Sequence, residues 1–392
     1  MVRPFSWKWL NRYFETLLEY IFLSFQPFTI SLQYHSIKHA AIGKVCERLS
    51  VLQPIVKRML DNYNCKSFPQ MLEGKKILYV HGFASSGSSG TVTGLRQLFP
   101  SATVVAPDLP VHPQEAVELL QKVCSEEQPH LVIGTSMGGM YTEMLSGCDR
   151  IVVNPAFRMG DTISKHNMLG KVTFMNPRAD GVQEFIMTKQ LQAEYKEVCS
   201  HCFAHAAEED KHVWGLFGLE DTTVDTYDLF ASYYSKALHF HGEHRLNDST
   251  LLHSVVPVVR WIDDAQEHRQ RNVVYINITE TMEHGGQPRP SLLKAYRMLI
   301  ENYEVIPVAS LPTNHPEQAA RMQEWVFETL GVAAWNRLIL TNRKDLLIGD
   351  YLIDATGTDG AADFMGTLIP FGSETFKTWD DVIENFSRLG GQ

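Results

Sequence analysis

The stretch Leu131–Gly139, which reads LVIGTSMGG, decides the fold of this chain. Its first three residues form a short apolar run of the kind expected for a buried strand. Gly134-Thr135-Ser136-Met137-Gly138 follows directly and has the pattern G-x-S-x-G. In this pattern a sharp turn from strand to helix lifts the serine clear of the backbone, and the flanking glycines leave room for the turn. The sequence therefore predicts Ser136 as an exposed nucleophile at the start of a helix.

Strand-like and helix-like stretches alternate on both sides of this motif. The expected strands are 77–80, 103–106, 151–153, 213–217 and 237–241, and the expected helices are 114–124, 139–145 and 249–262. Such alternation is typical of a parallel α/β sheet with helices on both faces. The more polar residues 161–210 interrupt it, and we expect them to form a helical cap over the site.

A second alternating region follows the charged stretch 263–271, which we interpret as a linker. Its expected strands are 273–276, 305–308 and 337–340, and its expected helices are 291–303 and 317–330. This pattern predicts a second, Rossmann-like α/β domain. The expected organisation is an extension at 1–70, a first domain at 71–268 and a second domain at 271–392.

Composition limits the classes of function. The 392 residues include 35 Lys and Arg against 45 Asp and Glu, a net charge of −10, which disfavours binding to nucleic acid or to anionic lipid. Six cysteines are too few for a disulfide framework in a chain of this length. We therefore expect a reducing compartment, with the cytoplasm as the location, and no membrane partner.

The N-terminal region contains an apolar run, 14–32, that imitates a membrane anchor. Glu15, Glu19, Gln26 and Pro27 interrupt the run, so it falls short of the roughly 18–20 apolar residues that span a bilayer. No small-residue cleavage site follows it. We expect a helical extension of unknown role rather than a membrane span, and an extension unrelated to the fold is the alternative.

The G-x-S-x-G arrangement calls for an acid and then a histidine, each on a loop that follows a strand. Asp221 follows the expected strand 213–217 and is the predicted acid, with Asp225 and Glu220 as rivals. His244 follows the strand 237–241 and is the predicted base. Its rivals are His239, His241 and His253. In this interpretation Asp221 holds the imidazole of His244, which takes the proton of the Ser136 hydroxyl.

An oxyanion hole requires two backbone N–H donors, one from the residue after the nucleophile and one from the loop after an early strand. Met137 and Phe83 occupy those positions. The loop 85–90 consists of serines and glycines, which allow a close approach to substrate. His81 precedes this loop, and we interpret it as a residue that orients the loop rather than as a proton carrier.

Four segments together resemble the small bacterial esterases of the YqiA type, which belong to the α/β-hydrolase superfamily. They are Tyr79-Val80-His81-Gly82-Phe83, Pro107-Asp108-Leu109-Pro110, Gly134–Gly139 and Val153-Asn154-Pro155-Ala156, and the resemblance spans 76–262. It implies a serine esterase that cleaves small or moderate acyl esters, a small-molecule substrate and no cofactor. The residue before His244 is glutamate, where this family often has aspartate. A non-catalytic binding protein and an acyltransferase that uses the same triad are the alternatives.

Residues 271–389 resemble the 5'-deoxyribonucleotidases of the haloacid dehalogenase superfamily, through Arg337–Thr341 and Gly349–Asp354. Active members carry two aspartates in a D-x-D after the first strand, where they help to hold Mg²⁺. This chain has Asn277-Ile278-Thr279 there, and an amide cannot form an aspartyl-phosphate.

Ser310 and Lys344 match the phosphate-contacting positions of that family, and Asp350 and Asp354 are retained. The resemblance thus implies a degenerate phosphatase domain without a metal, which binds a phosphorylated ligand or braces a homo-oligomer. A residual nucleotidase that uses Asp354 and Glu280 is the alternative.

Overall fold

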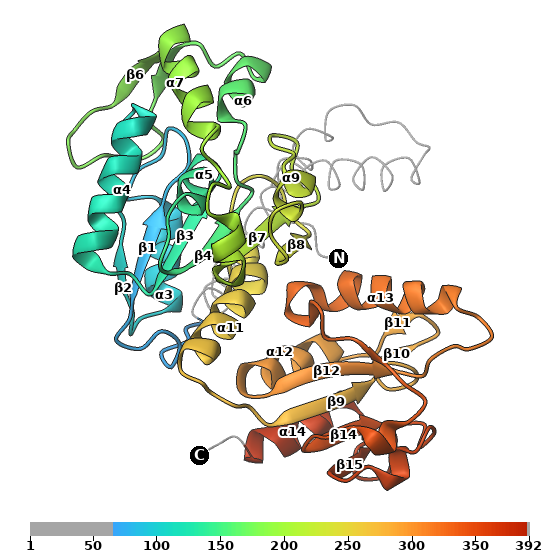
Figure 1. Ribbon diagram of the computed structural model, residues 1–392. Coiled ribbons are helices and arrows are strands. Elements are labelled where there is room, and N and C mark those ends of the chain that lie inside the picture. Colours follow the sequence, from blue (N-terminus) through green and yellow to red (C-terminus); the bar gives the residue numbers. More distant parts are fainter. Residues whose placement is uncertain (1–65, 390–392) are drawn as a thin grey trace, which may run out of the picture. The chain divides into compact units, whose positions relative to one another are not determined.

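The computed structural model describes residues 66–389, and the predicted extension therefore lies almost entirely outside the described residues (Figure 1). This holds also for the apolar run 14–32. Within 66–389 no helix is both long and apolar enough to cross a membrane.

The first sheet has six strands in the order β2-β1-β3-β4-β7-β8, and every neighbouring pair is parallel. The strands are β1 (Lys76–Val80), β2 (Thr103–Val105), β3 (Leu131–Thr135), β4 (Asp149–Val153), β7 (Val213–Gly218) and β8 (Ala237–Phe240). Because the sheet is parallel, the loops that follow β3, β7 and β8 meet at one edge. The prediction of a parallel α/β sheet is confirmed.

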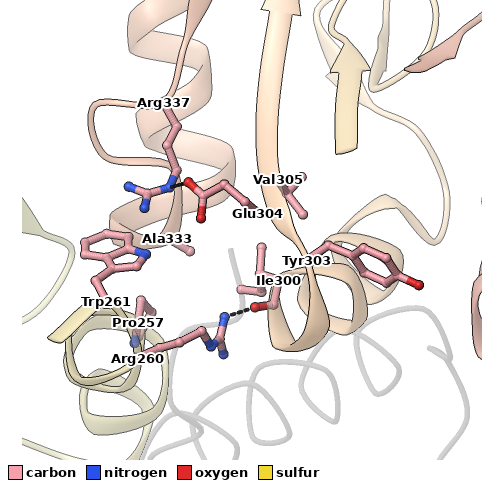
Figure 2. Close-up of a pocket in the computed structure, with 9 residues that line it drawn as sticks. All are labelled: Pro257, Arg260, Trp261, Ile300, Tyr303, Glu304, Val305, Ala333 and Arg337. Carbon is pink, nitrogen blue, oxygen red and sulfur yellow. Dashed lines mark hydrogen bonds and ion pairs between the residues drawn. The ribbon is translucent and has the colours of Figure 1, made fainter. Parts of the chain in front are cut away.

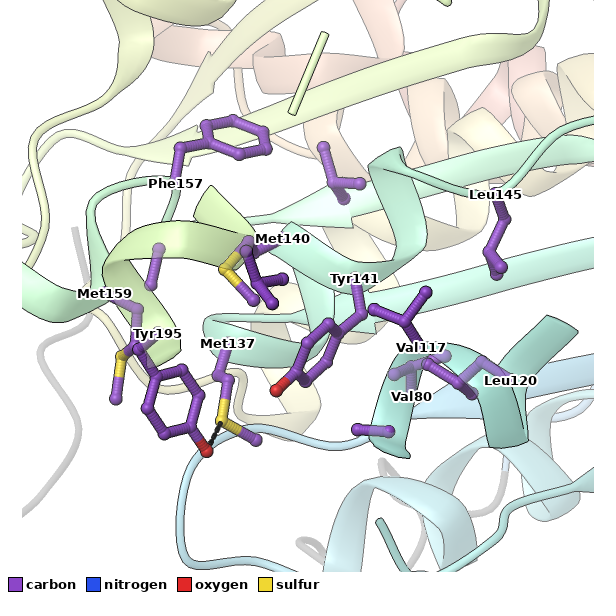
Figure 3. Close-up of a cluster of buried hydrophobic side chains, with 14 of the residues drawn as sticks. Val80, Val117, Leu120, Met137, Met140, Tyr141, Leu145, Phe157, Met159 and Tyr195 are labelled. Carbon is purple, nitrogen blue, oxygen red and sulfur yellow. Dashed lines mark hydrogen bonds between the residues drawn. The ribbon is translucent and has the colours of Figure 1, made fainter. Parts of the chain in front are cut away.

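Alternate residues of the central strands bury their side chains on opposite faces of this sheet. Ile77 of β1 belongs to the apolar cluster under α3 (Gly90–Leu98) and α11 (Val256–Gln266). Its neighbour Leu78 belongs to the cluster under α4 (Pro113–Glu127) and α5 (Met137–Glu143). Figure 3 shows part of the second cluster, with side chains of α5 among those of α4. Helices thus cover both faces of the sheet.

The segment between β4 and β7 is not purely helical, so the prediction of a helical cap over 161–210 is wrong in part. It contains α6 (Met159–Lys165), α7 (Lys189–Cys199) and α8 (Ala206–Glu209), but also an antiparallel hairpin of β5 (Gly170–Thr173) and β6 (Glu184–Met187). The hairpin connection is bound to the loop after β1. Met175 N donates to the oxygen of Ala84 at 2.8 Å, and Ser86 Oγ donates to the oxygen of Pro177 at 2.8 Å.

Part of the predicted linker 263–271 is helix, so that prediction is wrong at its beginning. Helix α11 continues to Gln266, and Asp263 is only 1% exposed. The carboxylate of Asp263 lies 2.7 Å from Lys75 Nζ, and this ion pair allows an acidic residue to be buried at the end of the helix. Packing of the first domain also begins before Met71, because Phe68 is buried in the cluster under α3.

The second sheet has five parallel strands in the order β13-β12-β9-β14-β15. They are β9 (Val273–Asn277), β12 (Glu304–Ala309), β13 (Ile339–Leu340), β14 (Tyr351–Asp354) and β15 (Thr367–Pro370), with α12 (Leu292–Asn302), α13 (Glu317–Leu330) and α14 (Trp379–Leu389) around them. Along β9, Val274 and Ile276 face one apolar cluster and Tyr275 faces another. The predicted second α/β fold is confirmed.

Candidate functional site

Ser136 lies in the sharp turn between β3 and α5. Its backbone has φ 55° and ψ −121°, a conformation that costs energy for a residue with a Cβ atom. Both glycines of the motif are required by the packing around this turn. A Cβ at Gly134 would overlap with the Thr142 hydroxyl, and a Cβ at Gly138 would overlap with the main-chain oxygen of Val80. The local sequence therefore forces Ser136 into the strained, half-buried position at the turn that a nucleophile needs.

Ser136, His244 and Asp221 form one continuous chain of hydrogen bonds. His244 Nδ1 lies 2.7 Å from Asp221 Oδ2, and His244 Nε2 lies 2.9 Å from Ser136 Oγ. Because an ionised carboxylate only accepts, Nδ1 carries the proton and Nε2 is left to accept from the hydroxyl. Asp221 is 4% exposed and His244 is 20% exposed, so the base reaches solvent while its orienting acid is buried. The three residues predicted from separate loops are brought together.

Of the three candidate acids, Asp221 is the one whose carboxylate lies against His244 in the described residues. Asp221 Oδ1 accepts from Thr223 N at 2.7 Å and from Val224 N at 3.1 Å, so the loop holds the carboxylate toward His244. Glu220 instead accepts from Gly242 N at 2.5 Å. Asp225 is exposed and makes no side-chain hydrogen bond within 66–389.

The other histidines near β8 are engaged elsewhere. His239 stacks on Tyr227 with ring centroids 3.8 Å apart, and burial lowers its pKa. Burial also lowers the pKa of His253, to about 4, with positive charge from Arg297 as a smaller cause. His241 lies between the carboxylates of Glu220, on the loop after β7, and Glu328, on α13.

The predicted oxyanion donors lie on the two segments that flank Ser136. Met137 opens α5, so its amide is one of the N–H groups that have no partner inside the helix. In the described part of the chain, neither this amide nor that of Phe83 donates to another protein group. The Phe83 ring meets Phe185 of the hairpin edge to face, with centroids 5.7 Å apart. An apolar wall therefore stands beside the loop that supplies the second donor.

His81 holds the loop after β1 in place. Its Nδ1 donates to the oxygen of Gly82 at 2.9 Å, and its Nε2 accepts from Leu109 N at 3.1 Å. It is 2% exposed, and burial lowers its pKa, which keeps the ring neutral at neutral pH. Asp108 holds the same loop. Its two carboxylate oxygens accept from Gly87 N at 2.8 Å and from Ala179 N of the hairpin connection at 2.6 Å. His81 thus has the loop-orienting contacts that we predicted.

Asn154 is a site residue for which sequence reasoning assigned no role. It is 1% exposed, and its Oδ1 accepts from Gly218 N at 2.7 Å. Its Nδ2 donates to the oxygens of Glu243 and His244 at 3.0 and 3.1 Å. One amide therefore ties the acid loop to the histidine loop. The available signal in the sequence was a polar residue directly after the apolar run 151–153.

The polar residues of the second sheet form a separate buried group. Lys344 Nζ lies 2.7 Å from Asp354 Oδ2, and both side chains are 0% exposed. Ser310 donates to Asp359, whose carboxylate also lies 3.9 Å from Lys344. Asn277 Nδ2 approaches Asp354 Oδ1 at 3.4 Å. Ser310, Lys344, Asn277 and Asp354 are thus brought together at the ends of the strands.

Two other residues of that prediction lie elsewhere. Asp350 precedes β14 and accepts from Val273 N at 2.7 Å, at the opposite ends of the strands from Asp354. Glu280 pairs with His284 at 2.7 Å and with Arg289 at 3.0 Å on the surface. Neither is placed to replace a first-strand nucleophile.

The described residues do not fit the Mg²⁺ that this kind of domain implies. The ammonium of Lys344 occupies one oxygen of Asp354, and the other accepts from Thr356 N at 2.6 Å and Gly357 N at 3.1 Å. Asn277 supplies only a neutral amide oxygen, which has no partner. Within 66–389 no group of three or more metal-binding side chains is found. The cation of this group is therefore a lysine of the chain itself.

Comparison with known proteins gives matches to parts of the chain. Residues 76–250 match the model of an uncharacterised protein family, UPF0227. A putative 5'(3')-deoxyribonucleotidase of Vibrio phage KVP40 is 33% identical over 97 residues, which are 25% of this chain and 57% of that protein. The chain thus spans little more than half the length of this curated relative.

Solved structures similar to part of this chain include the following two. The monoacylglycerol lipase of Paleococcus ferrophilus is 15% identical, with a TM-score of 0.35, over 51% of this chain and 96% of that chain. Est1E from Butyrivibrio proteoclasticus is 14% identical, with a TM-score of 0.34, over 52% of this chain and 92% of that chain.

Proposed function

We propose that this protein is a serine hydrolase that cleaves carboxylic esters with small or moderate acyl groups. The observation that carries the proposal is the hydrogen-bonded chain from Asp221 through His244 to Ser136, with contacts of 2.7 and 2.9 Å. Hydroxyl, imidazole and carboxylate in this order make a weakly nucleophilic serine reactive near neutral pH. The family match over 76–250 includes all three of these residues and specifies no substrate.

In the proposed reaction, His244 Nε2 takes the proton of Ser136 Oγ as the oxygen attacks the ester carbonyl carbon. The negative charge that develops on the carbonyl oxygen is stabilised by the N–H groups of Met137 and Phe83. His244 then gives its proton to the departing alcohol, which leaves an acyl group on Ser136. A water molecule, deprotonated by the same imidazole, then attacks the acyl carbon. His244 returns this proton to Ser136 Oγ as the bond to the serine breaks and the carboxylic acid leaves. Asp221 stabilises the imidazolium in both halves and keeps its proton at Nδ1.

Aromatic side chains support the choice of a small or moderate acyl group. Phe83 packs on Phe185, and Phe185 lies 5.3 Å from Phe174, centroid to centroid. The guanidinium of Arg178 covers the other side of this group, 4.6 Å from the Phe174 ring. An apolar wall of limited extent beside the oxyanion loop is suited to a short hydrocarbon chain.

The decisive experiment compares wild type, Ser136→Ala and the control Ser232→Ala in fluorophosphonate labelling and in hydrolysis of nitrophenyl acetate, butyrate and octanoate. Ser232 is exposed and lies on a helix end away from the triad contacts. We expect labelling and turnover in wild type and in the control. Ser136→Ala should lose labelling, and its turnover should fall at least about a thousandfold.

Two results would change the proposal. A wild type that neither labels nor turns over would favour a non-catalytic binding protein. A wild type that labels, but releases nitrophenol beyond one equivalent only when an alcohol or amine acceptor is added, would favour acyl transfer with the same triad.

A further inference from the structure

The end of α13 and the turn that follows it, Phe327–Trp335, belong to the second sheet's domain in sequence but pack into the first. We call these residues the bracing segment. Val332 is 3% exposed and is part of the apolar cluster that contains Leu216 of β7 and Leu238 of β8. The Trp335 ring meets Trp214 of β7 edge to face, with centroids 5.6 Å apart. The bracing segment thus supplies part of the core beneath β7 and β8.

These two strands carry the acid and the base of the proposed triad. Strand β7 ends at Gly218, shortly before Asp221, and β8 ends at Phe240, shortly before His244. The positions of these two side chains depend on how firmly the strand ends are held. A displacement of a catalytic side chain by about 1 Å can lower the rate roughly a hundredfold. Support for the strands is therefore support for the triad.

The bracing segment also contacts the two loops themselves, through His241. His241 Nε2 lies 3.0 Å from Glu328 Oε2, and His241 Nδ1 lies 3.2 Å from Glu220 Oε1. The imidazole further packs on the ring of Phe327, with centroids 5.3 Å apart. The carboxylate of Glu220, next to Asp221, in turn accepts from Gly242 N at 2.5 Å. One chain of contacts runs from the second domain through both triad loops.

The rest of the junction fixes the orientation of the bracing segment. Figure 2 shows a small pocket lined on one side by α11 and on the other by the second domain, with an arginine on each side. Arg260 of α11 is 5% exposed and donates to the oxygen of Ile300 near the end of α12. Arg337 pairs with Glu304 at 2.8 Å, and its guanidinium lies 4.1 Å from the Trp261 ring. These directional contacts hold α11 and the second domain in one arrangement.

We propose that the bracing segment is a positioning element for Asp221 and His244, with Glu328 and Val332 as its acting residues. Glu328 positions the two loops through His241, and Val332 supports the strands from below. The second domain then serves the hydrolase site directly, although its own site lacks the phosphatase aspartates. This inference rests on the proposed ester hydrolase function.

The test uses the full chain and compares Glu328→Ala, Glu328→Gln and Glu324→Ala. Glu324 is an exposed glutamate on the same helix that forms no ion pair within 66–389, and it is the matched control. We expect Glu328→Ala to lower kcat for nitrophenyl butyrate and the rate of fluorophosphonate labelling about two- to fivefold, with KM unchanged, since a half-exposed contact has a modest effect. Glu328→Gln should restore the wild-type kcat, because an amide can still hydrogen-bond to the imidazole.

A double-mutant cycle separates positioning through His241 from a general effect on the fold. His241→Ala should lower kcat at least as much as Glu328→Ala, and the double variant should behave like His241→Ala alone, since both act through one contact. Val332→Ala should also lower kcat several-fold at temperatures about 20 °C below its own melting point, where loss of folded protein plays no part.

Failure of the inference and failure of the proposed function give different results. If wild type labels and turns over while Glu328→Ala and Val332→Ala keep its kcat and labelling rate, the inference is overturned. Additive effects of His241→Ala and Glu328→Ala would overturn the assigned contact. If wild type neither labels nor turns over, the proposed function fails and this inference fails with it.

Discussion

The side-chain nitrogen of Asn154 donates to the main-chain oxygen of His244 at 3.1 Å. The same amide accepts from Gly218 N at 2.7 Å, so a single buried residue directly after β4 joins the segments that follow β7 and β8. Buried amides that satisfy several backbone groups fix those groups relative to one another. We therefore regard Asn154 as a residue that positions the base of the proposed triad.

Replacing Asn154 by aspartate should slow the reaction without changing the backbone preference. Asn154 has φ 46°, a region that asparagine and aspartate both tolerate. The carboxylate would still accept from Gly218 but would face the oxygens of Glu243 and His244 without a proton to donate. We expect kcat to fall about tenfold or more, with a loss of about 1–3 kcal/mol in the free energy of unfolding.

The control for this variant is Asn167→Asp, at an exposed residue with φ 51°. Ester turnover and urea unfolding should both remain at wild-type values. A wild-type kcat in Asn154→Asp would show that the two loops keep their geometry without this amide.

The acid should be distinguishable from its neighbour by one pair of substitutions. Asp221→Asn removes the charge that stabilises the imidazolium and allows the wrong tautomer of His244, so we expect kcat to fall by roughly a factor of ten thousand. Asp225→Asn changes an exposed carboxylate and should leave kcat unchanged. Steady-state hydrolysis of nitrophenyl butyrate measures both, and the opposite ranking would reassign the acid.

Low pH should destabilise the protein, because its buried histidines must take up protons when it unfolds. The pKa of His253 is lowered from 6.5 to about 4 by burial, and burial also lowers the pKa of His81. Between pH 6.5 and 4 the unfolded chain binds more protons than the folded chain, so the stability present above pH 6.5 is lost as the pH falls. His253 alone should account for about 1 kcal/mol at pH 5.5.

Urea unfolding at pH 7.5 and 5.5 tests this expectation. His253→Gln should show a smaller loss between the two pH values than wild type, whereas His201→Gln, at an exposed histidine, should show the same loss as wild type. Equal losses in all three proteins would remove His253 as a cause.

The buried ion pair of the second domain should be far more sensitive to the loss of one partner than to the loss of both. Lys344→Met leaves the carboxylate of Asp354 buried without its cation, and we expect a loss of about 3–5 kcal/mol in the free energy of unfolding. Lys344→Met combined with Asp354→Asn should recover much of it. Urea unfolding provides the measurement, with Lys377→Met, at an exposed lysine, as the control.

Much of this molecule could be predicted from local patterns. The apolar runs in the sequence predicted strands of both sheets, because strands buried on both faces of a parallel sheet consist of continuous apolar residues. The run 131–133, for example, lies within the observed β3. The Ser136 turn could be predicted because the glycines on either side of it have no substitute. The acid and the base followed from strand order, since parallel strands bring their following loops to one edge.

What could not be predicted depends on contacts between distant residues. The strands of the β5 and β6 hairpin have only four residues each, the lower limit for a recognisable alternation, and the hairpin is held by bonds to the loop after β1. The charge of Asp263 favours a linker in sequence, and its pairing with Lys75 and Arg269 explains its burial. The role of Asn154 depends on contacts with the segments after β7 and β8, and the sequence does not show that these segments lie beside the end of β4.

The packing of Val332 among residues of β7 and β8 has a thermodynamic consequence. Two domains that merely touch can melt one after the other, but here the interior of one is completed by a side chain from the other. Unfolding of the second sheet would withdraw Val332 and Trp335 and open a cavity in the first. Calorimetry of the full chain should therefore record a single cooperative transition for both sheets instead of two separate ones.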